Sequence, residues 1–564
     1  MSGVMVRSIT ALLLVLAACV AAMPSSAGAA QTGLNATNSS AADLDALARQ
    51  TGATWERQFV RWDAIETTGP GRWTAGSLTH LDRVVADAHA AGRKVVIGVL
   101  GTPQWASGST DALVPPTDPT TYANFVGALA ARYRGRVAAW EIWNEPDASE
   151  FWHRTVGAAA YAPLLIAAHR AIEAQDPAAL VLAAPSTGND YPFLEGLYAA
   201  GAGADFDGVA VHTDTACGIT SPDVYYREGG RVGRFSFLGL REVHATLAAH
   251  GHGDRPIIIT ELGWSATSTV CARGVWAGTK AAGVTEANQA AFLRLAYRCL
   301  MDYPYVKAAL WFNLRDNGAA DTELHRYGLI RWDGTPRPSL DAFTDVSRNG
   351  AATAGACGDF TAPSLKVAAP LSGALYDRTL AIGASAVDAH STLSRITFYA
   401  NGTRIRSFTG TAARQTAVAQ MTWFGARNLP YGNVTITIEA VDAYGNARRQ
   451  SVQVQRVDPA TLPTQATRMS LRVSGRGLTR TVRGRLGAHA TAAAFTPQGR
   501  VRLSWQRRSG ARWVTRHRAS RSATRAFSYR QNLAARGRWR LVATYAGAAP
   551  FRPARRVLST ITVR

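Results

Sequence analysis

WEIWNEP, at residues 140–146, joins an apolar, strand-like run to a polar end. A second stretch, IIITELGW at residues 257–264, has the same form. Each stretch places one glutamate, Glu145 in the first and Glu261 in the second, where the apolar run stops. If both runs are strands of one parallel barrel, their C-terminal ends meet at one face, so the two carboxylates are expected to share a site there.

Six more strand-like runs lie between residues 32 and 345, and Ala-rich amphipathic segments separate them. Eight β units with helices between them predict an α/β fold, the closed (β/α)8 TIM barrel. An open doubly wound sheet is the structural alternative, but no GxGxxG motif follows the first run, so nothing indicates a dinucleotide. The expected strands are residues 32–36, 54–60, 94–100, 137–143, 180–184, 206–211, 256–260 and 306–312.

Short alternating strands with turn residues follow the barrel, and they predict two all-β immunoglobulin-like sandwich modules. Asn401-Gly402 is a hairpin signal between two of these strands. The expected domains are a signal peptide at 1–29, the catalytic barrel at 30–345, a linker at 346–360, an immunoglobulin-like β-sandwich at 361–457, a linker at 458–467 and an Arg-rich β-sandwich at 468–564.

The positive charge of the chain is confined to its C-terminal module. The 564 residues carry a net charge of +22, but residues 465–564 alone hold 23 Arg and no Lys, Asp or Glu. The rest of the chain is nearly neutral, so any argument about anionic partners concerns this module. We expect it to bind an anionic cell-surface polymer or an acidic polysaccharide. Nucleic acid is not an expected partner, because no recognition motif is present.

The N-terminus resembles an export signal. Arg7 precedes an apolar run at residues 9–20, and SAGAA at 26–30 offers an Ala-x-Ala cleavage pattern. These features predict a secreted protein. LAAC at residues 16–19 also resembles a bacterial lipobox, so a lipid anchor on Cys19 is the alternative. No later segment is long and apolar enough to form a transmembrane span.

Four cysteines remain after this signal, and export makes disulfides permissible. Cys217 and Cys271 follow the sixth and seventh strands, whose loops rise from the same barrel face, so we favour a disulfide between them. Cys299 on the last long helix and Cys357 in the exit linker form the other expected pair. None of the four has CxxC spacing, so no zinc site is expected.

Two carboxylates across a barrel mouth suit glycoside hydrolysis. One carboxylic acid protonates the leaving oxygen, and the other carboxylate attacks the anomeric carbon or activates water. The two glutamates supply this chemistry alone, so no metal and no cofactor is expected. Trp105, Trp264 and Trp311 stand near the ends of expected strands, where indole rings stack on sugars.

WNEP at 143–146 and TELGW at 260–264 resemble the signatures of glycoside hydrolase clan A. Within the clan, EIWNEPD at 141–147, followed by Phe151-Trp152, is most similar to family 39. GTPQW at 101–105 and the closing YGLI at 327–330 and PRP at 336–338 fit the same pattern, and the resemblance covers residues 32–345.

This resemblance implies a retaining mechanism, with Glu145 as the acid/base and Glu261 as the nucleophile. It implies that Asn144 hydrogen-bonds the sugar 2-hydroxyl, that Arg57 lies near the nucleophile, and that His212 lies at the rim of the active site. The substrate is then a polysaccharide or an oligosaccharide. An inverting hydrolase and a catalytically silent polysaccharide-binding barrel are the alternatives.

Two points of the motif need a structural answer. Strict alternation along a strand points Asn144 and Glu145 to opposite faces, so we expect a bulge or an unusual peptide within 143–146. Many clan members have His-x-Tyr where this chain has His212, Thr213 and Asp214, which leaves the tyrosine partner of the nucleophile unassigned. Glu141 lies inside its strand and is expected to be structural.

Overall fold

The computed structural model describes residues 30–564 except for 37–38, 214–220, 272–277, 279–280, 353–356, 410–413, 489–494, 496 and 525. The chain divides into two compact units, Met1–Gly358 and Asp359–Arg564. The predicted signal segment at 1–29 and Cys19 lie outside the described residues. No helix in the described part of the chain is long and apolar enough to cross a membrane.

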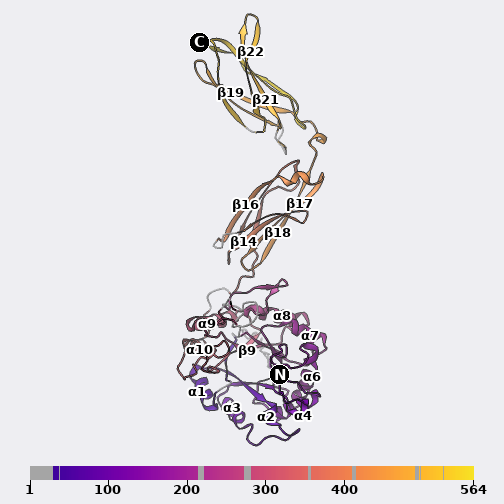
Figure 1. The fold of residues 1–564 in the computed structure, drawn as a ribbon, viewed down its shortest axis with the longest axis vertical. Coiled ribbons are helices and arrows are strands. Elements are labelled where there is room, and N and C mark those ends of the chain that lie inside the picture. Colours follow the sequence, from indigo (N-terminus) through magenta and orange to yellow (C-terminus); the bar gives the residue numbers. More distant parts are fainter. Residues whose placement is uncertain are drawn as a thin grey trace, which may run out of the picture. The chain divides into compact units, whose positions relative to one another are not determined.

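Eight parallel strands close the predicted barrel in the order β1-β10-β9-β6-β5-β4-β3-β2. Helices surround these strands (Figure 1). Each of the eight predicted runs overlaps one barrel strand, with bounds that differ by one or a few residues. The barrel strands are β1 (Gln31–Asn35), β2 (Trp55–Arg61), β3 (Lys94–Leu100), β4 (Ala139–Ile142), β5 (Leu180–Ser186), β6 (Gly208–His212), β9 (Ile257–Leu262) and β10 (Val306–Trp311).

The barrel strands are largely buried on both faces, which explains why most of them are nearly continuous apolar runs. The exception is β2, which carries the buried polar residues Glu56, Arg57 and Gln58. Inward-facing side chains such as Trp55, Val96 and Ile258 fill the barrel, so it encloses a packed core. The surrounding helices are α1 (Ala41–Thr51), α2 (Trp62–Ile65), α3 (Thr79–Ala90), α4 (Gln104–Ser107), α5 (Pro119–Arg132), α6 (Ala158–Glu173), α7 (Tyr191–Ala199), α8 (Leu240–Ala249), α9 (Glu286–Leu300) and α10 (Pro338–Asn349).

Several of these helices begin at a capping side chain. Ser40, Asp118, Asp190 and Thr285 each accept a hydrogen bond from a backbone N–H of the first turn of α1, α5, α7 and α9. Such caps satisfy donors that have no partner within the helix, so they fix where each helix starts. A short hairpin of β7 (Arg227–Glu228) and β8 (Arg231–Val232) precedes α8, and the 3-10 turn η1 (Phe237–Gly239) lies between the hairpin and the helix.

The predicted disulfide between Cys299 in α9 and Cys357 is present, with a Cα–Cα distance of 5.3 Å. It ties the segment after α10 to the last long helix of the barrel. Cys271 is also disulfide-bonded. Cys217, which we expected to be its partner, lies outside the described residues.

The first β-sandwich has its own core of buried side chains, including Ile382, Phe398 and Ile436. Asn401 and Gly402, with φ of 46° and 81°, form the predicted hairpin turn between β14 and β15. One sheet contains β11 (Ser364–Ala369), β13 (Leu380–Val387) and β16 (Thr416–Trp423). The other contains β12 (Ala374–Tyr376), β18 (Ala447–Arg456), β17 (Gly432–Asp442), β14 (Leu393–Ala400) and β15 (Thr403–Thr409), and η2 (Gly425–Asn428) joins the sheets.

The second β-sandwich follows the 3-10 turn η3 (Pro459–Thr461) and encloses Trp505, Tyr529 and Trp539 in a separate core. Its three-stranded sheet has the order β19 (Thr467–Ser474), β20 (Thr479–Ala488) and β23 (Phe527–Asn532). Its larger sheet contains β22 (Arg512–Ser522), β21 (Arg500–Ser509), β24 (Gly537–Tyr545), β25 (Ala554–Val557) and β26 (Ile561–Val563).

Candidate active site

One buried arginine organises the C-terminal face of the barrel. Arg57 of β2 is fully buried, and its guanidinium reaches three side chains from other segments. Nε lies 2.5 Å from Glu141 Oε2, Nη1 lies 2.6 Å from Glu261 Oε1, and Nη2 donates to Asn144 Oδ1 at 3.2 Å. Burial alone lowers the pKa of Arg57, but the two carboxylates outweigh it and the net shift is upward. The arginine is therefore a fixed cation.

The backbone after β4 has the unusual conformation expected from the motif. Trp143 and Glu145 have positive φ angles of 73° and 41°, which residues with a Cβ rarely adopt. The N–H of Glu145 donates to Pro185 O after this turn, at 3.0 Å. Because strand alternation is interrupted here, Asn144 and Glu145 both reach the polar network of the barrel mouth.

His212, the last residue of β6, lies between the two glutamates and is completely buried. Its Nδ1 lies 2.6 Å from Glu145 Oε1, and its Nε2 lies 3.4 Å from Glu261 Oε1 and 3.5 Å from Nη2 of Arg57. Since a guanidinium only donates, Nε2 faces it as an acceptor and the ring proton is on Nδ1, from which it is donated to Glu145. One imidazole thus joins the two carboxylates.

Burial gives Glu145 and His212 unusual acidities. It raises the pKa of Glu145 to about 7, although the Arg57 charge opposes this and Glu150 reinforces it. Burial lowers the pKa of His212 to about 4, so the imidazole is neutral near pH 7. Two carboxyl groups in different environments, one buried beside a neutral histidine and one paired with an arginine, are suited to separate acid and base roles.

The three predicted sugar-stacking tryptophans occupy different positions. Trp311 of β10 is fully buried, and its indole N–H donates to Tyr327 O. Trp264, which follows β9, packs against Trp311 with ring centroids 6.3 Å apart and is 2% exposed. Trp105 of α4 is partly exposed, and its indole N–H donates to Glu66 O. Their contact with a sugar stays a prediction.

The indole nitrogens of Trp264 and Trp311 differ. Nε1 of Trp264 is buried and has no hydrogen-bond partner among the residues that the structure describes. A buried N–H without a partner carries a desolvation cost, so this group is a candidate donor to a bound hydroxyl or water. The donor of Trp311, in contrast, is already satisfied by Tyr327.

Two acidic residues have roles that the sequence shows only in part. Glu141 was expected to be structural, and its ion pair with Arg57 holds that guanidinium in place beneath Glu261 and Asn144. Asp147 was not singled out, yet its carboxylate accepts from the Thr187 N–H, and burial raises its pKa to about 7. The sequence feature that could have indicated Asp147 is its position two residues after Glu145. Asp214 lies outside the described residues.

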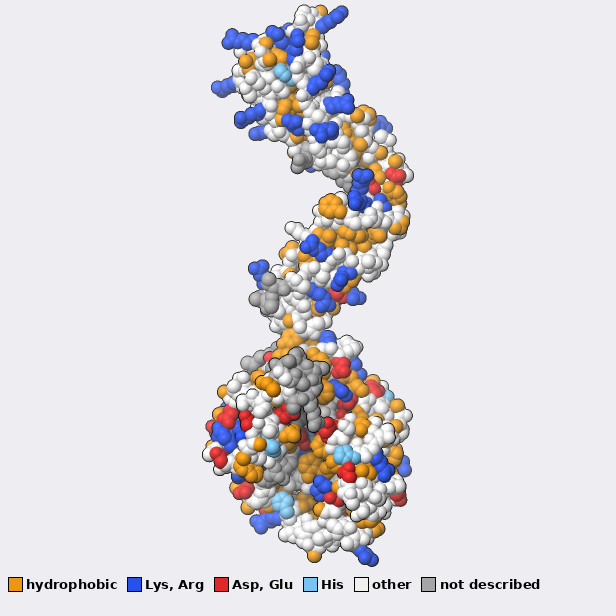
Figure 2. Space-filling model, viewed as in Figure 1, with side chains coloured by type: hydrophobic (Ala, Val, Ile, Leu, Met, Phe, Trp, Pro, Cys, Tyr) orange, Lys and Arg blue, Asp and Glu red, His pale blue; other side chains and the backbone are white. Residues whose placement is uncertain are grey.

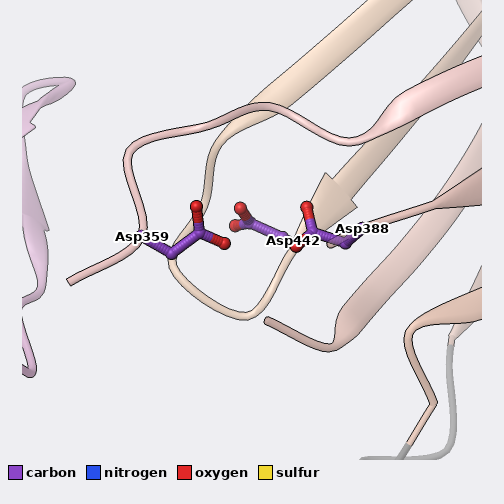
Figure 3. Close-up of side chains that lie close together, drawn as sticks. All are labelled: Asp359, Asp388 and Asp442. Atoms are coloured by element: carbon purple, nitrogen blue, oxygen red, sulfur yellow. The ribbon is translucent and has the colours of Figure 1, made fainter. Parts of the chain in front are cut away.

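Outside the barrel, one cluster could hold a metal ion within the described part of the chain. Asp359, Asp388 and Asp442 of the first sandwich are buried, and each offers an oxygen within 4.8 Å of the others (Figure 3). Backbone N–H groups already donate to Oδ1 of Asp388 and of Asp442. These bonds order the loops without an ion, so the cluster by itself assigns no metal.

Comparisons with known proteins match one family model and several solved structures. Residues 363–438 match the family model described as a bacterial Ig domain, and no curated protein matches the chain. A family 39 glycoside hydrolase from Bacteroides cellulosilyticus is 19% identical, covering 69% of this chain and 79% of its own, with a TM-score of 0.46. An endo-beta-1,4-mannanase from Thermotoga petrophila is 14% identical, covering 76% and 98%, with a TM-score of 0.41.

The structure of a glucosidase from Croceicoccus marinus also matches this chain. It is 15% identical, the match covers 89% of this chain and 92% of that one, and the TM-score is 0.42. The strand order of the chain itself shows the closed eight-strand barrel, and the family match shows a bacterial immunoglobulin-like module after it.

Proposed function

We propose that this protein is a retaining glycoside hydrolase that cleaves O-glycosidic bonds of a polysaccharide or an oligosaccharide. The observation that carries the proposal is the joint placement of Glu145 and Glu261. The two come from different strands of the barrel, and a single network of Arg57 and His212 contacts both. Two carboxyl groups with different environments at a barrel mouth are the groups that hydrolysis by double displacement uses.

In the first step, Glu145 acts as the acid. With a pKa of about 7 it holds a proton near neutral pH, and it donates that proton to the glycosidic oxygen as the bond to the anomeric carbon breaks. Glu261 attacks the anomeric carbon with a carboxylate oxygen and forms a covalent glycosyl-enzyme. Arg57, which forms an ion pair with Glu261, supplies the positive charge that a carboxylate nucleophile needs beside it.

In the second step, Glu145 acts as the base. Its carboxylate accepts a proton from water while the water oxygen attacks the anomeric carbon, and the bond to Glu261 breaks. The Nδ1–H of His212 stabilises the carboxylate that exists between the two steps. Asn144 turns its Oδ1 toward Arg57, and no described residue accepts from its side-chain NH2, which suits it to the sugar 2-hydroxyl.

The test is turnover on a panel of aryl β-glycosides and soluble polysaccharides. Glu145→Gln and Glu261→Gln are each expected to lower kcat by at least about 100-fold, since positioned acid–base groups contribute about 10²–10⁴-fold. Glu173→Gln on the exposed end of α6 is the matched control and should leave turnover unchanged. Proton NMR of the first product should show the anomer of the substrate.

Other outcomes identify the alternatives. Product of the opposite anomeric configuration would make the enzyme inverting. Binding of a polysaccharide by the wild type and by both glutamine variants, with no turnover of any substrate, would make the barrel a binding protein.

We also propose that the protein is exported and released. The support is the signal-like segment at 1–29, together with the disulfide between Cys299 and Cys357, since disulfides persist mainly outside the cytosol. N-terminal sequencing of the mature protein is expected to begin near Ala30. A mature chain that begins at Cys19, carries lipid and fractionates with membranes would support the anchored alternative.

A further inference from the structure

Five arginines occupy one face of the three-stranded sheet of the C-terminal module. Side chains on alternate positions of β19, β20 and β23 point either to the core or to the outside. Met469, Leu471, Val482, Leu486 and Tyr529 belong to the core, and the intervening positions are exposed. The outward positions include Arg468, Arg472, Arg483, Arg485 and Arg530, which we call the arginine face.

The register of the sheet brings like charges together on this face. Arg472 of β19 pairs directly with Arg483 of β20, and the ladder continues with Ser470 opposite Arg485 and with Thr481 opposite Arg530. Like charges directly opposite each other destabilise a sheet. Residues 465–564 contain no acidic residue, so the module has no internal anion to offset this repulsion.

The five guanidinium groups have no hydrogen-bond or ion-pair partner among the described residues of the chain. The larger sheet of the same module is mixed: Arg500 donates to Ser520, and Arg540 donates to Gln506 and covers the ring of Trp513. Its exposed Arg502, Arg518 and Arg555 have no such partner among the described residues. Figure 2 shows Lys and Arg side chains on the C-terminal module without acidic side chains beside them, whereas both signs are mixed on the barrel. The arginine face is therefore available to an external anion.

The residues between the arginines indicate the class of anion. Ser470, Ser474, Thr481 and Ser528 are outward on the same three strands, and Asn532 ends β23. Hydroxyl and amide groups can exchange hydrogen bonds with sugar hydroxyls. The outward positions hold no aromatic residue, although single-stranded nucleic acids are bound largely by stacking their bases on aromatic rings.

We propose that the arginine face binds an acidic polysaccharide through its carboxylate groups. Guanidinium groups bind carboxylates through paired hydrogen bonds, and arginines spaced along extended strands suit an extended polymer. Arg468 and Arg472 are four residues apart on one strand, about 13 Å, so the face spans several charges of a polymer. The inference rests on the proposed function in one respect: a tethered glycan raises the local concentration of sugar at a sugar-cleaving barrel.

The experiment measures binding by the full-length Glu261→Gln protein, so that turnover does not consume the probe. The probes are polygalacturonate, a neutral dextran of similar length, and single-stranded DNA. The protein is expected to bind polygalacturonate more tightly than both other probes at the same ionic strength. Its affinity for polygalacturonate should fall as the salt concentration increases. Equal binding of dextran, tighter binding of DNA, or no binding of polygalacturonate would overturn the proposal.

Variants locate the surface. One variant combines Arg472→Ser, Arg483→Ser and Arg485→Ser. It is expected to bind polygalacturonate about tenfold more weakly and with a smaller salt dependence, because each exposed ion pair contributes modestly. The control removes three exposed arginines of the larger sheet, with Arg502→Ser, Arg518→Ser and Arg555→Ser combined.

Equal weakening by both sets would mean that net charge alone attracts the polymer, and the assignment to this face would be wrong. A cooperative thermal unfolding transition at or above the wild-type temperature verifies that each variant is folded. Wild-type turnover is measured separately. A protein that binds polygalacturonate but hydrolyses nothing would keep this inference and overturn the proposed function.

Discussion

The Nδ1 atom of His212 lies 2.6 Å from Oε1 of Glu145. The same ring faces Glu261 and Arg57 through its other nitrogen. Because burial keeps this imidazole neutral, it donates one hydrogen bond to Glu145 without adding a positive charge beside it. A charged histidine would hold Glu145 ionised at neutral pH, and a neutral one leaves the glutamate free to carry a proton.

Activity is expected to decline on the alkaline side of neutrality. Glu145 must be protonated to act as the acid, and burial raises its pKa to about 7, so kcat/KM should fall as pH rises above about 7. Glu150→Gln removes a negative charge that raises this pKa and should move the decline to lower pH. A kcat/KM profile against pH measures both effects. A profile of Glu150→Gln that overlays the wild type, like that of Glu173→Gln, would contradict the assignment.

Replacing His212 tests the hydrogen bond itself. His212→Phe keeps an aromatic ring of similar size but removes the Nδ1–H donor to Glu145, so kcat should fall by about 10–100-fold, equivalent to about 1.4–2.7 kcal/mol. The matched control is His250→Phe, since His250 also contacts a glutamate, Glu195, at 2.8 Å on the surface. If both variants retain wild-type kcat, His212 only fills space.

Arg57→Lys is expected to lower both activity and stability. A lysine cannot contact Glu141, Glu261 and Asn144 together, so kcat/KM should fall by at least about 100-fold. Glu141 would also lose the hydrogen bond from Nε of Arg57, and leaving a buried polar group without its hydrogen-bond partner costs about 1–3 kcal/mol or more. Denaturant unfolding and steady-state kinetics measure the two effects.

Arg93→Lys is the control for that substitution. Arg93 is another buried arginine that contacts two carboxylates, Glu56 and Asp45, but it lies away from the candidate site. Its replacement should reduce stability while leaving kcat/KM unchanged. Equal losses of activity in the two variants would show that Arg57 acts only through stability.

The disulfide between Cys299 and Cys357 is expected to stabilise the barrel unit. Their sequence separation is 58 residues, and closing a loop of that size stabilises the folded state by about 2–4 kcal/mol through the unfolded chain. The double variant Cys299→Ser and Cys357→Ser should therefore unfold at lower denaturant concentration. Dithiothreitol should no longer shift its unfolding midpoint through this bond. A midpoint shift equal to that of the wild type would contradict the assignment.

Arg483→Thr is expected to stabilise the C-terminal module. The change removes the like-charge pair with Arg472 and places a residue favoured in strands on an exposed position. The gain should be about 0.2–1 kcal/mol in thermal unfolding at low salt, and it should shrink at high salt because the repulsion is screened. A loss of stability at low salt would mean that the two guanidinium groups do not repel each other in the folded module.

Local pattern predicted the barrel strands well because most of them are apolar runs buried on both faces. It was less exact at β4, which was expected to reach Trp143 and instead ends at Ile142. The left-handed conformation of Trp143 ends the strand, and the contacts that hold it there, such as the bond from its indole N–H to Phe151 O, come from outside the strand. Only the requirement that Asn144 and Glu145 face one site indicated that the backbone had to turn.

The sequence by itself determined the order of strands and helices, the two glutamates at strand ends and the separation of basic charge into one module. These features follow from local periodicity and composition, which the chain carries residue by residue. The tertiary structure decided that Arg57 joins Glu141 to Glu261, that His212 is neutral between two glutamates, and that Arg472 faces Arg483. Those relations depend on the register between distant strands and on burial, and neither is set by the residues nearest in the chain.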